Sequence, residues 1–200
     1  MNKKTRSARS LTTKLAISAA LLTFLTACAN QTVLRPVQLD NYDPEDLFYL
    51  AGKGPVKTEV IGNPFNEAKP QVDRSTTSAM TGATFRPKLA FDTEVPPEQN
   101  SPYHVVMVLD APTNARPEKL CANPEDAYRP ASTQPGGSDL RVVAVYCVND
   151  RRLSSIAGTA PRPASSSDPR FHKLIQEATL NLFPLDNPDR RDGNRLRRIR

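Results

Sequence analysis

Two runs of β-branched residues limit the folds open to this chain of 200 residues. They are "YHVVMVLD", from Tyr103 to Asp110, and "LRVVAVYCV", from Leu140 to Val148. Both have the length of strands and are apolar nearly throughout, which is typical of strands that are covered on both faces. We therefore expect them to form the core of a sheet.

Other segments give weaker strand signals. "NDRR" follows Val148 and leads into "LSSIAGTA", which favours an antiparallel hairpin. Residues 56–61, "VKTEVI", are typical of a strand that a Gly-Asn-Pro turn ends. Residues 65–101 are ambiguous, because "STTSAMTGATF" fits a helix or a loop and Pro87 favours an edge strand for "FRPKLAF".

A helix near the C-terminus has the pattern needed to cover such a sheet. Its apolar residues form one stripe: Phe171, Leu174, Ile175, Ala178 and Leu182. Asp168 is a good N-cap and Pro169 suits the first helical position. Pro184 cannot continue the helix, which should end near Phe183. The sequence therefore predicts an α+β fold, with a small antiparallel sheet packed against this C-terminal helix and with long Pro-rich loops.

A shorter helix is predicted near the start of the domain, in "DPEDLFYLAGKG". Asp43 is a candidate N-cap and Pro44 suits the first helical position. Gly52 can end the helix at about Ala51. We place a single domain at residues 43–188.

The first 27 residues have the organisation of a secretory signal. "MNKKTRSARSLTTK" carries five Lys and Arg and no acid, and "LAISAALLTFLTA", residues 15–27, carries no charge. A basic segment followed by a short apolar segment with small residues at its end is typical of a signal peptide. The apolar segment is shorter than the ~20 residues that span a bilayer. We interpret residues 1–27 as a signal peptide.

Leu25-Thr26-Ala27-Cys28 resembles the lipobox of bacterial lipoprotein precursors, in which two small residues lie between a Leu and a Cys. The resemblance implies that the Cys28 thiol receives a diacylglyceryl group. It also implies that a signal peptidase cuts before Cys28 and that the new amine is acylated by a fatty acid such as palmitate. Lipid on Cys28 would anchor the chain to a membrane, since two or more acyl chains hold firmly.

The residues after Cys28 bear on where the anchor lies. Ala29, not Asp, follows the cysteine, which under the enteric sorting rule implies the outer membrane, with the protein on its periplasmic face. Residues 28–42 read as a lipidated tether, and as a coil residues 29–42 would span about 20 Å. The rest of the chain resembles lipoproteins of Gram-negative bacteria, which implies a place but no activity.

Once Cys28 carries lipid, Cys121 and Cys147 remain as an even pair in an oxidising compartment. A disulfide between them would pin the Pro-rich connection of residues 111–139, whose length is unusual in a compact domain. On the chain-entropy model it would stabilise the fold by roughly 3–4 kcal/mol. The alternative is two free thiols, one of them a nucleophile.

Much of the net charge of +6 belongs to the two ends of the chain. Residues 189–200 hold six Arg against two Asp, and without this tail and the signal the chain has 16 basic and 19 acidic residues. This balance disfavours nucleic-acid binding. We expect the tail to be disordered, and it is either a solvated terminus or a contact for an anionic surface or an envelope protein. The arginines concerned are Arg190, Arg191, Arg195, Arg197, Arg198 and Arg200.

Catalytic and metal-binding motifs receive no support from the sequence. His104 and His172 lie in no ligand-spaced group, and His172 falls off the apolar stripe, so we expect it to be solvated. Lys53 in "AGKGPV" lacks the phosphate-binding loop pattern and reads as a turn residue. No Gly-x-Ser-x-Gly is present. We expect no catalytic residue, no metal and no cofactor.

Three functions stay open from the sequence. The leading one is a membrane-anchored lipoprotein that binds, as an accessory subunit of an envelope complex, and is not an enzyme. The second is an envelope hydrolase, for which His104, Cys121, Asp110 or Asp150 would have to converge in a cleft. The third is a carrier of lipid or a small molecule, which needs an apolar cavity between sheet and helix.

Overall fold

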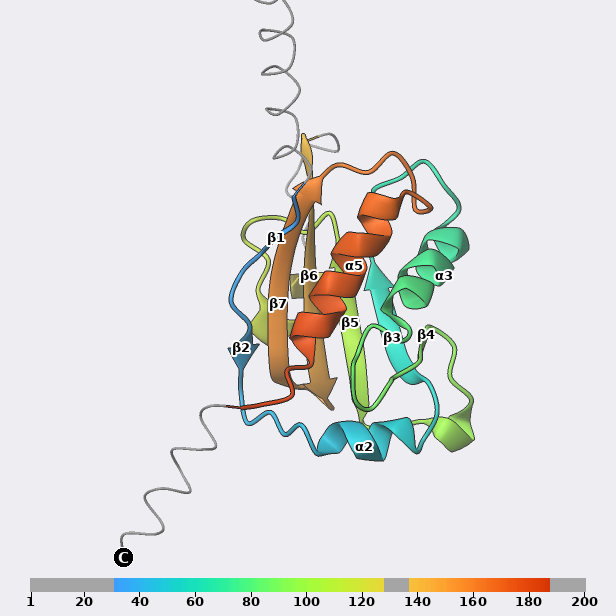
Figure 1. Ribbon diagram of the computed structural model, residues 1–200, viewed down its shortest axis with the longest axis vertical. Coiled ribbons are helices and arrows are strands. Elements are labelled where there is room, and N and C mark those ends of the chain that lie inside the picture. The colour runs from blue at the N-terminus through green and yellow to red at the C-terminus, as the bar shows by residue number, and fades with distance from the viewer. Residues whose placement is uncertain (1–30, 128–136, 188–200) are drawn as a thin grey trace, which may run out of the picture. The chain divides into compact units, whose positions relative to one another are not determined.

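The computed structural model describes residues 31–127 and 137–187, which form an α+β fold around one seven-stranded sheet (Figure 1). The strand order is β1-β7-β6-β5-β3-β4, and β2 also pairs with β7. The predicted fold class is confirmed. The strands are β1 (Val33–Leu34), β2 (Gln38–Leu39), β3 (Val56–Ile61), β4 (Phe91–Asp92), β5 (Tyr103–Leu109), β6 (Asp139–Val148) and β7 (Arg151–Pro161).

The sheet is mixed rather than purely antiparallel. Strands β5, β6 and β7 are antiparallel neighbours, as predicted, and the turn at Asn149 joins the hairpin. Strand β3 instead runs parallel to both β4 and β5. The helix α3 (Lys69–Met80) follows β3 and carries the chain back along the sheet, and such a crossover makes the next strand parallel. The sequence signal for α3 was ambiguous, so the antiparallel prediction is wrong for this part.

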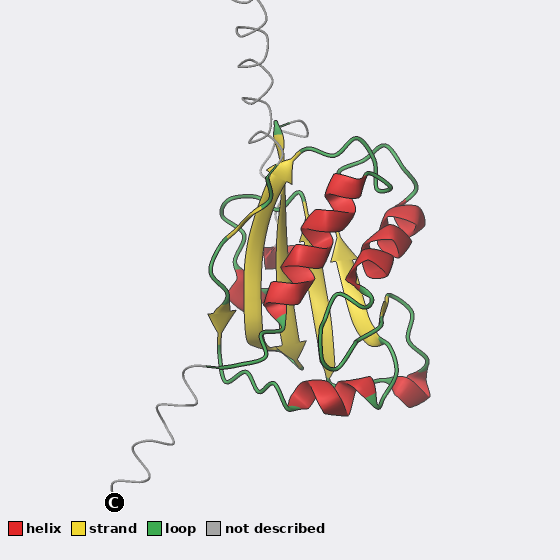
Figure 2. Ribbon diagram, in the orientation of Figure 1, coloured by secondary structure: helices red, strands yellow, loops and turns green. Residues whose placement is uncertain are grey.

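Helices α3 and α5 (Pro169–Leu182) lie together on one face of the sheet, as Figure 2 shows. The predicted N-cap of α5 is confirmed, because the Asp168 carboxylate accepts the Arg170 N–H at 2.9 Å. The predicted stripe of α5, including Leu174, is buried against the sheet. A Cβ at Gly158 of β7 would lie 2.7 Å from Leu34 and 3.1 Å from Leu174, so glycine permits this close approach.

The second face of the sheet carries a smaller apolar cluster. It includes Val106, Val143 and Leu120, and the connection between β5 and β6 covers it with the 3₁₀ turn Pro117–Lys119 and the short helix α4 (Pro124–Ala127). Cys121 of this connection is bonded to Cys147 of β6, with an S–S distance of 2.01 Å and a Cα–Cα distance of 5.7 Å. The predicted disulfide is therefore confirmed.

The fold begins fewer residues after Cys28 along the chain than the sequence predicts. Strands β1 and β2 pair with β7, and Tyr42 is fully buried, so the segment predicted as the end of the tether belongs to the sheet. The apolar positions of this segment are too few to reveal two-residue strands. The prediction of a tether reaching residue 42 is wrong from Val33 onward.

The helix α2 (Asp46–Ala51) also begins later than predicted. The Asp43 carboxylate accepts the N–H of Glu45 at 3.0 Å, so it closes a turn before the helix instead of capping it. Leu47 and Leu50 anchor α2 in the core. Among the described residues, no helix combines the length and the apolar character needed to cross a bilayer.

Candidate functional site

A polar hollow of about 620 Å³ lies where β3 and β5 begin and where β6 turns into β7. In the register of the sheet, His104 lies opposite Lys57 of β3 and opposite Cys147 of β6. Directly opposed side chains share a face, so the imidazole lies between the Lys57 side chain and the disulfide. The lining residues are Lys57, Glu59, Asn100, Ser101, Pro102, His104, Asn149 and Asp150.

Burial lowers the pKa of His104 and outweighs the Pro102 carbonyl and the carboxylates of Glu59 and Asp150, which act to raise it. The ring is therefore neutral at pH 7. A neutral imidazole carries one N–H and one nitrogen lone pair, so the ring can both donate and accept a hydrogen bond. The hollow can thus accept a hydrogen bond or a proton at His104.

Of the four side chains that a hydrolase would need in one cleft, the structure places two in the same hollow. His104 and Asp150 share the hollow, whereas Cys121 is held in the disulfide. Asp110 lies at the other end of β5, where its carboxylate accepts a hydrogen bond from Arg162 at 2.8 Å. Within the described ranges, no three His, Cys, Asp or Glu side chains are placed to hold a metal ion.

His172 is not the solvated residue that the sequence predicts. Its Nε2 lies 3.1 Å from both the Ser75 hydroxyl and the Ser166 carbonyl oxygen. A carbonyl oxygen only accepts, so Nε2 carries the proton and cannot take one from Ser75. This contact ties α3 to the segment before α5 and is structural.

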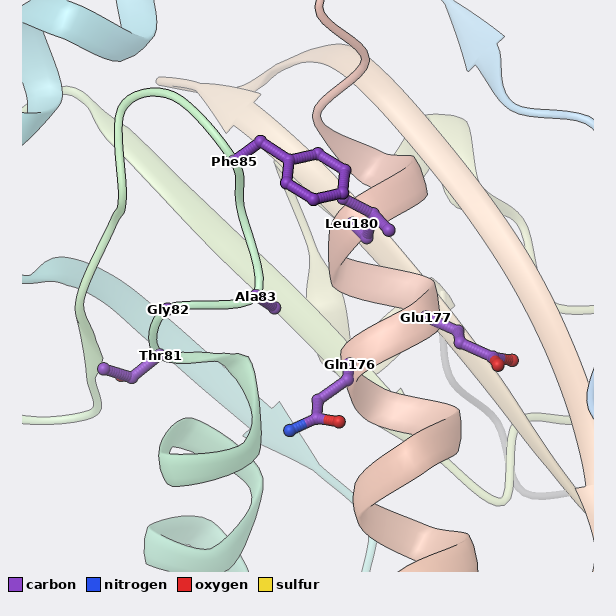
Figure 3. Close-up of a pocket in the computed structure, with 7 residues that line it drawn as sticks. All are labelled: Thr81, Gly82, Ala83, Phe85, Gln176, Glu177 and Leu180. Atoms are coloured by element: carbon purple, nitrogen blue, oxygen red, sulfur yellow. The ribbon is translucent and has the colours of Figure 1, made fainter.

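A second hollow, of about 370 Å³, lies between the loop after α3 and the middle of α5. Figure 3 shows the Phe85 ring pointing toward Leu180 across it. Phe85 is 67 % exposed, which is high for a large apolar side chain. The lining residues are Thr81, Gly82, Ala83, Phe85, Gln176, Glu177 and Leu180.

Sequence reasoning missed both hollows in different ways. Lys57 and Glu59 point to the same face because strand side chains alternate, so the period-2 pattern of β3 could have placed them beside His104. Phe85 has no such signal, because it lies in a loop. Lys53, predicted as a turn residue, lies just after α2 with its ammonium 5.3 Å from the centre of the Tyr49 ring.

The remaining predicted site residues lie outside the described residues. They are Cys28 and the tail arginines Arg190, Arg191, Arg195, Arg197, Arg198 and Arg200.

No family model and no curated protein matches the sequence. The chain is similar in structure to the PelC dodecamer from Paraburkholderia phytofirmans in two crystal forms. The identities are 13 % and 14 %, the TM-score is 0.39 for both, and 78 % and 76 % of this chain match 98 % of the PelC chain. A likeness this distant implies nothing about the activity of this chain.

Proposed function

We propose that this protein is a lipid-anchored lipoprotein of the outer membrane, on its periplasmic face, that works by binding as an accessory subunit of an envelope complex. The observation that carries the proposal is the lipobox-like Leu25-Thr26-Ala27-Cys28 after a basic and then an apolar segment. The Cys121–Cys147 disulfide supports export, because such bonds persist in oxidising compartments.

The surface proposed for the partner is the hollow beside Phe85. The Ser154 hydroxyl donates to the Leu182 carbonyl at 2.7 Å, so the end of α5 lies at the start of β7, whereas β1 pairs near the end of β7. An anchor attached ahead of β1 would hold the end of the sheet where β1 pairs with β7. The Leu180 side of the hollow lies toward the opposite end of the sheet. An apolar side chain of an envelope protein fits this position better than a lipid.

A carrier function receives less support. It needs space between the sheet and α5, where Leu34 and Leu174 close over Gly158. A second candidate function, an envelope hydrolase, is favoured by one observation, the neutral His104 beside Asp150. His104→Ala and Asp150→Asn, each tested for loss of cell-wall turnover, would decide it.

The anchor is tested by the mass of the N-terminal peptide of the native protein. We expect it to begin at Cys28 and to carry acyl chains, and Cys28→Ser should release the protein from membranes. A native chain with a free Cys28 thiol would contradict the proposal.

The partner surface is tested with a photo-crosslinking amino acid at position 85. Position 48 is the control, since Phe48 is 65 % exposed on α2. We expect one envelope protein to be crosslinked from position 85 and not from position 48, and Leu180→Lys to abolish the adduct. The same adducts from both positions would argue against a specific surface.

A further inference from the structure

Two arginines lie near each other on the second face of the sheet, at the end where the described fold begins. Val33, Thr159 and Arg141 form one row across β1, β7 and β6, so their side chains share this face. Arg35 follows Val33 by two residues, and its N–H donates to the Ala157 carbonyl at 2.9 Å, which continues the pairing. Arg35 and Arg141 therefore rise from the same face with only β7 between them.

Neither guanidinium is neutralised within the described part of the chain. The Arg141 Nε is buried and has no hydrogen-bond partner there, and burial with the nearby charge of Arg35 lowers the pKa of Arg141. Asp139 lies on the same face nearer the strand end, but among the described residues only burial and Arg35 shift the pKa of Arg141, and Asp139 does not. Arg162, at the same end of the sheet, differs from them because its guanidinium forms an ion pair with the Asp110 carboxylate.

A ligand that satisfies both side chains must be an anion. Two guanidinium groups this close repel each other, and a phosphate is the group that two arginines bind best, since each presents paired N–H donors to its oxygens. The hydroxyl of Thr159, in the same row, is a further donor.

The position of the pair indicates the source of this phosphate. Val33 is the fifth residue after Cys28, and five residue steps reach at most about 18 Å. If Cys28 carries lipid, as we propose above, this end of the sheet is held at the bilayer. Val33 is 61 % exposed on the same face and adds an apolar contact. We propose that Arg35 and Arg141 bind the phosphate of an anionic phospholipid headgroup and so orient the anchored domain.

The experiment uses the chain from residue 28 to 200 with Cys28→Ser, so that no lipid is present. Its binding is measured to phosphatidylcholine vesicles with and without phosphatidylglycerol. We expect Arg35→Gln to weaken binding to the anionic vesicles about fivefold, and the double variant with Arg141→Gln about 25-fold. Arg141→Gln should not lower the melting temperature, because it removes a charge without a partner.

Arg151→Gln is the matched control, because Arg151 is an exposed arginine at the opposite end of β7. The C-terminal arginines are present in every variant, so they do not affect the comparison. Equal losses for Arg35→Gln and Arg151→Gln would overturn the proposal in favour of diffuse attraction. Displacement from the vesicles by millimolar inorganic phosphate, with the same dependence on Arg35, would assign the site to free phosphate instead.

The two proposals fail separately. If native Cys28 is unmodified while Arg35→Gln still weakens vesicle binding selectively, the anchor is wrong and the headgroup site stands. If Cys28 is acylated while Arg35→Gln and Arg141→Gln have no effect, the headgroup site is wrong and the anchor stands.

Discussion

On one face of the sheet, α3 and α5 bury a broad apolar core that includes Leu174, Met107 and Phe171. On the other face, a connection with little regular structure covers a smaller cluster around Val106 and Val143, and the disulfide fixes it there. The first face is held by the burial of many side chains, which the helix period creates. The second buries a smaller apolar cluster, and one covalent bond adds to its stability.

The largest effect is expected on the helix face. Leu174 is fully buried against the sheet, and an Asp there would place a charge without a partner in the core. Leu174→Asp should unfold the domain, and Leu174→Ala should cost about 2–5 kcal/mol of unfolding free energy. Urea denaturation measures both. Gln176→Asp, at an exposed position of the same helix, is the control, and a native melting temperature for Leu174→Asp would refute this packing.

The disulfide should matter less and only on its own face. Cys121→Ala with Cys147→Ala should lower the free energy of unfolding by roughly 3–4 kcal/mol. We expect hydrogen exchange to rise in residues 111–127 and in the second face of β6, while α5 stays protected. Reductant should destabilise the natural protein and leave the double variant unchanged. If exchange rises equally in α5, the two faces are not independent.

The two faces should also lose stability in different pH ranges. Burial lowers the pKa of His104, so the unfolded chain takes up this proton first as the pH falls. The His104 contribution is therefore present above about pH 6.5 and is lost below it. The Arg170 hydrogen bond lowers the pKa of Asp168, whose contribution is lost progressively as the pH falls below about 4.

Stability measured from pH 8 to about pH 2 checks this order. His104→Gln should remove the loss that begins near pH 6.5 and leave the acid limb intact. Asp168→Ala should lower stability by about 1 kcal/mol at pH 7, as expected for a lost N-cap, and should flatten the acid limb instead. A His104→Gln profile that keeps the step near pH 6.5 would show that another group causes it.

The same contrast explains what the sequence could predict. Long elements with a clear period were predicted closely: β3, β5, β6 and α5 begin and end within about two residues of the expected positions. The helix α3 was left open between a helix and a loop, because its buried positions include Thr76 and Thr77, which weaken the apolar stripe. Strands β1 and β2 form because β7 offers them a partner, and a two-residue strand leaves no local pattern.

The candidate site was predictable only in part for a related reason. His104 and Asp150 were named among the groups that a hydrolase would need in one cleft, but nothing in the sequence indicated which of them meet. Their meeting depends on the tight turn at Asn149, whose N–H donates to the Pro102 carbonyl at 2.8 Å. The hollow beside Phe85 joins a loop to a helix that lies far along the chain. Such contacts between distant segments are set by tertiary packing, which residue spacing does not record.

The smallest predicted effect distinguishes the contribution of side-chain packing from that of hydrogen bonding in the core under α3 and α5. Tyr42 and Tyr146 are both fully buried, with ring centroids 6.2 Å apart. The Tyr42 hydroxyl donates to the Pro184 carbonyl at 3.0 Å, whereas the Tyr146 hydroxyl has no partner among the described residues. Tyr42→Phe should therefore cost about 1 kcal/mol of unfolding free energy, and Tyr146→Phe should cost nothing or stabilise slightly, because it removes a buried hydroxyl that gains no hydrogen bond.

Since each variant keeps its ring, urea denaturation of the pair isolates the hydroxyl contribution. Equal losses in both variants would mean that Tyr146 has a bound water as partner, and the aromatic cluster would then be a hydrated network instead of a dry core.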